Sequence, residues 1–156
     1  MKLAVGSDER THTTDVIVAE LEKRGHTVEL LGPLRAEKAS WVQVAREVAE
    51  RVARGQADEG ILFCWTGTGV SIAANKVPGI RAALCGDAET ARGARVWNRA
   101  NVLCLSLRAT SETIAQEILD AWFATPLGTD PADVECVEQM SEIENKFAGS
   151  KFKVQR

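Results

Sequence analysis

Short apolar runs alternate with longer helical patterns along most of this 156-residue chain, and this rhythm constrains the fold more than any other feature. The apolar runs occupy residues 2–6, 27–31, 59–64, 80–85 and 101–106. Helical patterns follow them at residues 13–25, 41–55, 69–76, 87–100 and 111–125. This alternation indicates repeated βα units and therefore a parallel sheet. Because such crossovers are right-handed, five units predict an α/β fold, a three-layer αβα sandwich with a five-stranded parallel Rossmann-like sheet.

The remaining segments complete this prediction. The third run, EGILFC, is apolar without alternation, which is typical of a central strand covered on both faces. Residues 32–39 are expected to form a loop, and a last helix is expected after Asp130 and Pro131. We expect a single αβα domain over residues 1–148, including the C-terminal helix, and a basic tail over residues 149–156.

Charge and residue usage exclude several classes of function. The formal net charge of -3 argues against nucleic acid as a partner, because binding a phosphate backbone needs a clustered basic excess. No apolar run approaches the roughly 20 residues that cross a bilayer, and the N-terminus turns polar too early for a signal peptide. We therefore expect a cytoplasmic protein with no membrane partner. The four cysteines lack C-x-x-C spacing, and with only two histidines a zinc site is not expected.

The segment CWTGTG, residues 64–69, follows the third predicted strand at the edge where parallel sheets bind ligands. Gly67 and Gly69 permit backbone angles that turn several N–H groups toward one point, and the following helix adds its positive end. This field would favour an oxyanion and stabilise a thiolate at Cys64. A cysteine that ends a buried strand is nevertheless more often a packing residue, and the turn is neither a dinucleotide fingerprint nor a P-loop.

The segment GSDERTH follows the first predicted strand. Asp8 comes directly after the strand, so its carboxylate is expected to point into the crevice at the sheet edge. Glu9 and His12 are further candidates in the same segment. Thr11 is better explained as a residue that caps the next helix.

A resemblance to a known family covers most of the chain. The segments GTGVSIAANKVPGIRAALC, MKLAVGSD, WNRANVLCL and ILDAWFAT resemble the ribose-5-phosphate isomerase B family, which includes galactose-6-phosphate isomerase. The similarity runs in register from Met1 to about Thr125. It implies a Rossmann-like domain, a homodimer that can pair into a tetramer, active sites at the subunit interface, and no metal or organic cofactor. Such enzymes interconvert an aldose phosphate and its ketose through a cis-enediolate.

The resemblance also implies roles for individual residues. Cys64 would be the base that moves a proton between C1 and C2, and Thr66 would position the sugar. The enediolate oxygen would be held by the backbone N–H groups of Gly67, Thr68, Gly69 and Val70. Three further positions match residues that bind or shape the sugar and phosphate sites, namely Asn75, Asn98 and Arg108.

Several site positions depart from the family pattern. Three tryptophans stand where the family has other residues. Trp65 stands in place of a glycine, Trp97 in place of the ring-opening histidine and Trp41 in place of a tyrosine. Glu9 replaces the histidine that follows Asp8, and Asp133 lies between Ala132 and Cys136 where the family has two phosphate-binding arginines. These changes remove donor groups and add acidic ones, so a phosphate dianion would be repelled. The indoles offer flat faces on which the C–H face of a sugar can stack.

We therefore expect an aldose–ketose isomerase that acts on a sugar or sugar phosphate other than ribose 5-phosphate, with Cys64 as the base. Asp8 or Glu9 would assist ring opening or shuttle protons in place of the missing histidine. The alternative is a non-catalytic family member that binds a sugar or a nucleotide-like ligand. It would use the turn as an anion site and the tryptophans as stacking walls. A nucleotide-binding protein outside the family is disfavoured because both phosphate-binding fingerprints are absent.

Overall fold

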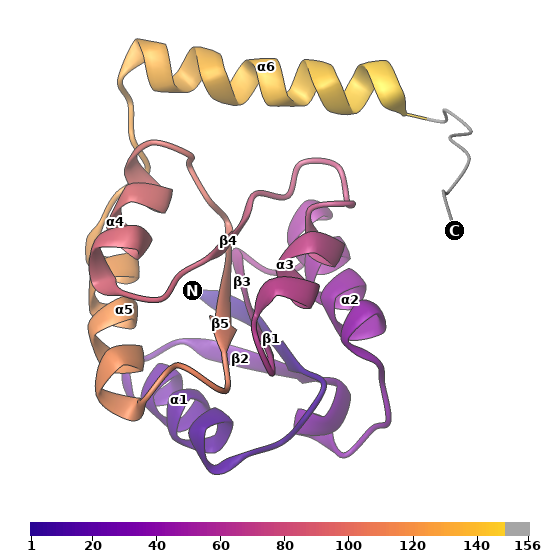
Figure 1. The fold of residues 1–156 in the computed structure, drawn as a ribbon, viewed down its shortest axis with the longest axis vertical. Coiled ribbons are helices and arrows are strands. Elements are labelled where there is room, and N and C mark those ends of the chain that lie inside the picture. Colours follow the sequence, from indigo (N-terminus) through magenta and orange to yellow (C-terminus); the bar gives the residue numbers. More distant parts are fainter. Residues whose placement is uncertain (149–156) are drawn as a thin grey trace.

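The computed structural model describes residues 1–148 and contains one five-stranded sheet with helices on both faces (Figure 1). The strands are β1 (Lys2–Ser7), β2 (Thr27–Leu31), β3 (Glu59–Cys64), β4 (Ala82–Leu84) and β5 (Val102–Ser106). They lie in the order β2-β1-β3-β5-β4, and every neighbouring pair is parallel. The predicted three-layer αβα sandwich is confirmed, and β3 is central, as its uninterrupted apolar sequence indicated.

Two groups of helices cover the sheet. One face packs against α1 (His12–Lys23), α4 (Ala88–Val96) and α5 (Glu112–Ala124), and the other against α2 (Trp41–Ala53) and α3 (Thr68–Ala74). Alternate residues of the central strand serve the two faces: Ile61 and Phe63 join the first apolar cluster, whereas Leu62 and Cys64 join the second. This alternation explains why the four residues from Ile61 to Cys64 are all apolar.

Polar side chains begin most of these helices. Thr11 caps α1 in a reciprocal arrangement with Thr14, and Ser40 does the same for α2 with Gln43. Asp87 caps α4 by accepting the N–H of Thr90 at 2.7 Å. A cap of this kind satisfies an N–H group that the helix itself leaves without a partner.

A buried polar cluster joins α4 and α5 to the start of β3. Arg95 Nη1 lies 2.7 Å from a Glu59 carboxylate oxygen, and Trp122 Nε1 donates to the other oxygen at 2.6 Å. The Arg95 guanidinium also lies 4.9 Å from the centre of the Trp122 ring. Burial raises the pKa of Glu59, although the charge of Arg95 and the hydrogen bonds from Trp122 and Arg95 oppose this rise.

Local geometry differs from the sequence prediction in three places. The expected loop at residues 32–39 contains a short 3-10 helix, η1 (Gly32–Arg35), which Pro33 favours by fixing its own φ angle. The β4 strand is shorter than the predicted 80–85, because the side chain of Asn101 takes the N–H of Arg81 at 2.8 Å. The α4 helix ends at Val96 and not at residue 100, since Arg99 adopts a positive φ of 50°.

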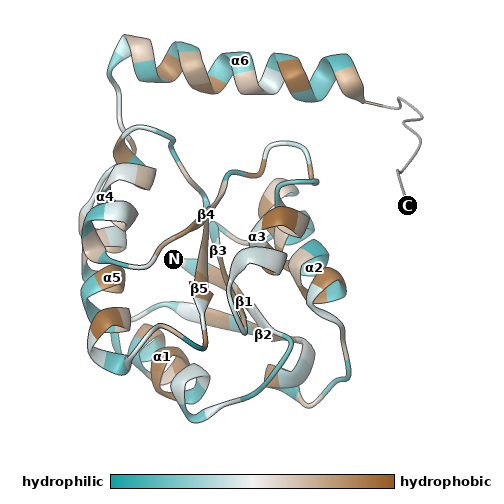
Figure 2. Ribbon diagram, in the orientation of Figure 1, coloured by the Kyte–Doolittle hydropathy of each residue, from teal (hydrophilic) through white to brown (hydrophobic). Residues whose placement is uncertain are grey.

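The last helix, α6 (Pro131–Phe147), lies apart from the sheet, across the top of Figure 1. It has no buried residue, and its surface alternates between hydrophilic and hydrophobic positions (Figure 2). Its Glu144 carboxylate accepts the N–H of Gly79 at 2.9 Å, which ties α6 to the loop before β4. The predicted basic tail, residues 149–156, lies outside the described residues.

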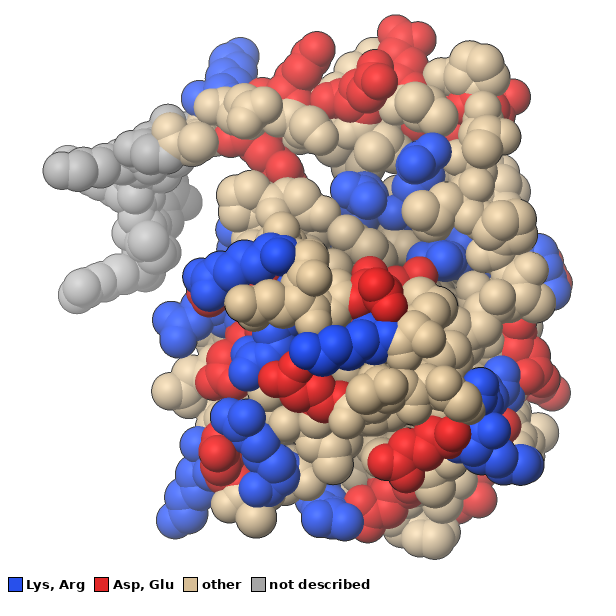
Figure 3. Space-filling model, turned by 180° about the vertical axis from the view of Figure 1, so that it is seen from behind, with Lys and Arg blue, Asp and Glu red and all other residues tan. Residues whose placement is uncertain are grey.

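The surface is mixed in charge. Basic and acidic side chains are interspersed on the face drawn in Figure 3, which also shows a hollow between α6 and the body of the molecule. A mixed face of this kind lacks the continuous basic field on which a nucleic-acid backbone binds. None of the helices within residues 1–148 is both long enough and apolar enough to cross a membrane.

Candidate active site

The carboxyl ends of β1 and β3 bring the segments GSDERTH and CWTGTG together. The two strands are neighbours, with Ser7 opposite Phe63, so the residues that follow them meet at one edge of the sheet. There they form a pocket of about 200 Å³, which we call the thiol pocket. Its lining residues are Asp8, Trp41, Cys64, Trp65, Thr66, Thr68 and Gly69.

Cys64 is almost fully buried, yet it lines the thiol pocket. It is only 5% exposed and belongs to the apolar cluster beneath α2 and α3. Its carbonyl oxygen accepts the N–H of Leu107 at 3.0 Å and that of Gly67 at 3.2 Å. These two bonds hold the main chain at the end of the strand, beside the pocket that the thiol lines.

The next residue, Trp65, is also anchored through its backbone. Its carbonyl oxygen accepts the N–H of Arg108 and the Oγ hydroxyl of Ser106, both at 3.0 Å. The indole is 61% exposed, and it stands at the rim of the pocket beside the thiol. These bonds hold the main chain of Trp65 in place, so its indole forms one wall at the rim of the pocket.

Gly67 is required by the shape of the turn. Its φ is +73°, and a Cβ atom there would lie 2.5 Å from Leu84 Cδ1 and 3.0 Å from the backbone carbon of Leu105. Its N–H donates to Cys64, so this donor is not available to a ligand. The donors that remain are the first N–H groups of α3, at Thr68, Gly69 and Val70, which have no acceptor within the helix.

The opposite wall is Trp41, the first residue of α2. A Cβ atom on Gly69 would lie 3.1 Å from its indole, so the ring lies directly against the glycine turn. Between the two walls, the hydroxyls of Thr66 and Thr68 lie 2.7 Å apart and share a hydrogen bond. The thiol pocket thus has aromatic walls and polar groups at the helix start.

Asp8 is the acid of the thiol pocket. Its Oδ1 atom is buried and has no hydrogen-bond partner within the described part of the chain. Burial raises the pKa of Asp8, and the nearby charge of Glu9 raises it further, whereas a backbone hydrogen bond works against both. A carboxylate in this state accepts a proton more readily than that of an ordinary surface aspartate, and its raised pKa suits a group that carries protons.

The other charged candidates of this edge lie outside the pocket lining. Glu9 is exposed, and His12, with 82% of its side chain exposed, pairs with Glu112 at 3.0 Å. Arg10 is held by Asp15 at 2.8 Å. Arg108 is exposed, and its contact with the site is the backbone bond to Trp65.

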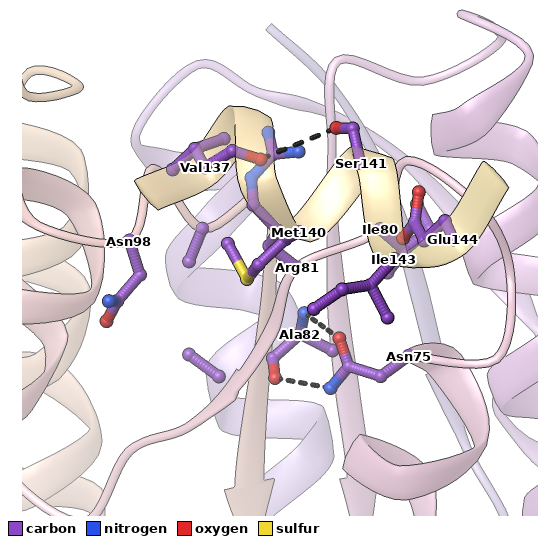
Figure 4. A pocket seen from close by; sticks show the side chains of 12 residues that line it. Asn75, Ile80, Arg81, Ala82, Asn98, Val137, Met140, Ser141, Ile143 and Glu144 are labelled. Atoms are coloured by element: carbon purple, nitrogen blue, oxygen red, sulfur yellow. Dashed lines mark hydrogen bonds between the residues drawn. The ribbon is translucent and has the colours of Figure 1, made fainter. Parts of the chain in front are cut away.

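Three candidates lie at the opposite edge of the sheet. Asn75 and Asn98 line a second pocket, of about 420 Å³, between α6 and the amino ends of β4 and β5 (Figure 4). The Asn75 amide is used by Ala82, whose backbone N–H and carbonyl it binds at 2.8 Å each. Trp97 is exposed and lies against Gly93 of its own helix. Within one chain these residues do not meet Cys64.

The family resemblance implied active sites at a subunit interface, but the sequence prediction did not say which residues lie at which edge of the sheet. The signal was present, because Asn75, Trp97 and Asn98 stand at or just after the ends of helices. In a βα unit, the helix carries the chain back to the amino edge of the sheet. Among residues 1–148, no three His, Cys, Asp or Glu side chains lie together as a metal site would require.

Comparisons with known proteins found a matching family model and several similar proteins. A family model described as Ribose/Galactose Isomerase matches residues 3–140. Ribose-5-phosphate isomerase B of Escherichia coli (strain K12) is 38% identical over 83% of this chain and 88% of its own. D-erythrulose-4-phosphate isomerase of Pectobacterium atrosepticum is 36% identical over 78% of this chain and 82% of its own. The solved structure of Clostridium thermocellum ribose-5-phosphate isomerase B has a TM-score of 0.86 at 38% identity, covering 94% of this chain and 99% of its own.

Proposed function

The chain belongs to the ribose/galactose isomerase family, and we propose that it is an aldose–ketose isomerase that uses the thiolate of Cys64 as its base. The observation that carries this proposal is the composition of the thiol pocket. A cysteine side chain and an acid with a raised pKa line one cavity beside the start of a helix. We expect the protein to act in the cytoplasm, without a metal or an organic cofactor.

The proposed reaction passes through a cis-enediolate and needs two proton carriers. The Cys64 thiolate removes the proton from C2 of the aldose, the C–H electrons form the C1–C2 double bond, and O1 becomes an oxyanion. Asp8 then moves a proton from O2 to O1. The Cys64 thiol returns its proton to C1 as O2 becomes the carbonyl oxygen of the ketose. We assign the second role to Asp8 ahead of Glu9, because Glu9 is exposed and lies outside the pocket lining.

The remaining pocket groups bind and orient the sugar in this account. The N–H groups of Thr68, Gly69 and Val70 would hold the enediolate oxygen, and such a donor is commonly worth about 3 kcal/mol in the transition state. The hydroxyl of Thr66 would bind the sugar chain. Trp41 and Trp65 would pack against its C–H face, because aromatic walls favour apolar surface.

We propose that the substrate is not ribose 5-phosphate. Asp8 lines the pocket and Glu9 lies beside it, so a phosphate dianion would face carboxylates. The nearby side chains of Arg10 and His12 already pair with Asp15 and Glu112, which leaves Arg108 as the candidate for a polar end of the sugar. The relatives carry names for more than one sugar phosphate, so a different substrate is compatible with the family.

We also propose that the protein works as a homodimer, or as a pair of dimers, with each site completed by the partner. Trp97 and Asn98 lie at the amino edge, far along the chain from the thiol pocket, and a two-fold axis can bring one edge against the other. Exposed apolar side chains support a buried surface in this region. Trp41 and Trp65 line the pocket, and Val42 and Ile72 belong to α2 and α3, which begin there.

Mixing two inactive variants tests the shared site. Cys64→Ala removes the base in one half-site and Asn98→Ala removes a contact in the other. In a symmetric dimer, random mixing restores one intact site in half of the dimers, so about a quarter of the activity should return. No recovery on mixing, for variants that each sediment as dimers, would contradict the shared site.

The activity itself is tested with a panel of free and phosphorylated tetroses, pentoses and hexoses incubated in heavy water. Exchange of the C2 proton of one of these sugars is the expected result. Tight binding without exchange, seen as quenching of tryptophan fluorescence, would favour the alternative of a non-catalytic protein that binds a sugar or nucleotide-like ligand. That alternative is supported by the positions of His12 and His26, since neither lines the thiol pocket.

A further inference from the structure

Ser106 ends β5, and its hydroxyl makes two hydrogen bonds that are not part of the strand pairing. The residue lies opposite Cys64, at the last pair between β5 and β3. Its Oγ hydroxyl donates to the carbonyl oxygen of Trp65 at 3.0 Å and accepts the N–H of Ala109 at 3.2 Å. A serine hydroxyl has a single hydrogen, so the bond to Trp65 uses its whole donor capacity. The side chain therefore joins the residue after β3 to the turn after β5.

The main chain around Ser106 has hydrogen bonds of its own. The N–H of Leu107 donates to the carbonyl oxygen of Cys64, and that of Arg108 donates to the carbonyl oxygen of Trp65, both at 3.0 Å. Neither bond involves the side chain of Ser106, which is half-buried at the edge of the sheet. The pairing of β3 with β5 therefore does not depend on the hydroxyl.

The two bonds of the hydroxyl act on two different residues of the proposed site. The first holds the carbonyl group of Trp65, whose indole is one wall of the thiol pocket. Without the serine that carbonyl keeps the N–H of Arg108, but one donor constrains its direction less than two donors do. The second bond holds Ala109 in the turn over residues 107–109, and Arg108 lies in the middle of this turn. One hydroxyl thus steadies the main chain of an aromatic residue and of a cationic residue.

We propose that Ser106 is a positioning residue of the substrate site, whose hydroxyl sets where Trp65 and Arg108 stand relative to Cys64. This inference rests on the proposed isomerase function. Ser106 does not line the thiol pocket itself, so it acts through these two residues. In the proposed function they bind the sugar away from the carbons that exchange a proton. Their displacement therefore weakens binding of the substrate and of the transition state alike, which raises KM and leaves kcat nearly unchanged.

Three variants test this role. Ser106→Ala removes the hydroxyl, and Ser106→Thr keeps a hydroxyl on the same carbon atom. Ser71→Ala is the matched control, because the Ser71 hydroxyl also donates to a backbone carbonyl oxygen, that of Ala82 at 3.3 Å, and Ser71 lies outside the thiol pocket. A serine that only supports the fold would lower the melting temperature on truncation without changing KM.

The first measurement needs no substrate. The indole N–H signals of the four tryptophans are followed by NMR, and the signal of Trp65 is identified from its loss in Trp65→Phe. Ser106→Ala should shift the Trp65 signal and leave that of Trp122 in place, since Trp122 is buried and bonded to Glu59. An unmoved Trp65 signal would overturn the proposal, whether or not the protein is an isomerase.

The second measurement is the steady-state kinetics of whichever sugar in the panel above exchanges its C2 proton fastest. Ser106→Ala should raise KM roughly three- to tenfold, as expected for the loss of about one hydrogen bond, with kcat within about twofold of wild type. Ser106→Thr and Ser71→Ala should keep the wild-type KM. A wild-type KM in Ser106→Ala, or an equal rise of KM in Ser106→Thr, would overturn the proposal while leaving the isomerase function intact. Exchange with no sugar of the panel would refute the isomerase function, and the NMR signals would still decide whether Ser106 positions Trp65.

Discussion

Replacing Gly67 with alanine tests whether the turn after β3 must be as tight as it is. The φ of +73° alone costs an alanine about 1–2 kcal/mol. The added Cβ would also lie 2.5 Å from Leu84 Cδ1 and 3.0 and 3.1 Å from backbone atoms of Leu105. Leu84 can move aside, but the β5 backbone cannot. Such overpacking costs about 1–3 kcal/mol more. We expect a total loss of about 2–5 kcal/mol in the free energy of unfolding.

Gly55→Ala is the matched control, because Gly55 has a similar φ of +68° with nothing within 4 Å of the added atom. It should lose only the backbone contribution, so urea unfolding should place Gly67→Ala well below it in stability. The turn of Gly67→Ala must also move away from β5 and carry the N–H groups of Thr68 and Gly69 with it. A misplacement of about 1 Å can cost about a hundredfold in rate. Equal unfolding midpoints for the two variants, or wild-type exchange in Gly67→Ala, would refute this reasoning.

Three further predictions concern the acid, the buried ion pair and the aromatic wall. Burial raises the pKa of Asp8, so the charged carboxylate destabilises the fold as pH rises through the folded pKa. Asp8→Asn should therefore have a higher melting temperature than wild type at neutral pH and no higher one at acid pH. The variant should also lose activity. Glu59→Gln leaves Arg95 buried without its carboxylate and should cost about 3–5 kcal/mol in urea unfolding; a loss under about 1 kcal/mol would show that the pair is not needed. Gly69→Ala should displace the indole of Trp41, which lies 3.1 Å from the added atom, and so shift the tryptophan emission and raise KM; an unchanged spectrum would contradict that contact.

Most of the fold follows from short-range patterns in the sequence. The centre of the sheet was predictable because four consecutive residues of β3, from Ile61 to Cys64, pack into two apolar layers. The starts of α2 and α4 were predictable because Ser40 and Asp87 cap them directly. The length of β4 was not predictable, since it depends on a side chain of Asn101 that reaches Arg81 from another segment. Such contacts leave no local signature.

The positions of some site residues were predictable from the sequence, and those of others were not. Asp8, Cys64 and Trp65 immediately follow strands, so a parallel sheet brings them together whatever else the chain does. The placement of His12 depends on its pairing with Glu112, a partner far away in the sequence. Asn98 lies at the other edge because a whole helix separates it from the end of β4. A family resemblance can mark a residue such as Asn98 as part of a site, but it does not say at which edge of the sheet that residue lies.

Proton exchange in a cysteine variant tests the central claim most directly. The measurement follows loss of the C2 proton of the best sugar to heavy water, by NMR, for Cys64→Ala and for the control Cys85→Ala. Cys85 is also buried in the wild type, and burial raises its pKa to about 12, so it stays a thiol outside the pocket. The account predicts that Cys64→Ala still binds the sugar but exchanges no proton above background, whereas Cys85→Ala exchanges as wild type does. Full exchange by Cys64→Ala would contradict the assignment of that thiol as the base.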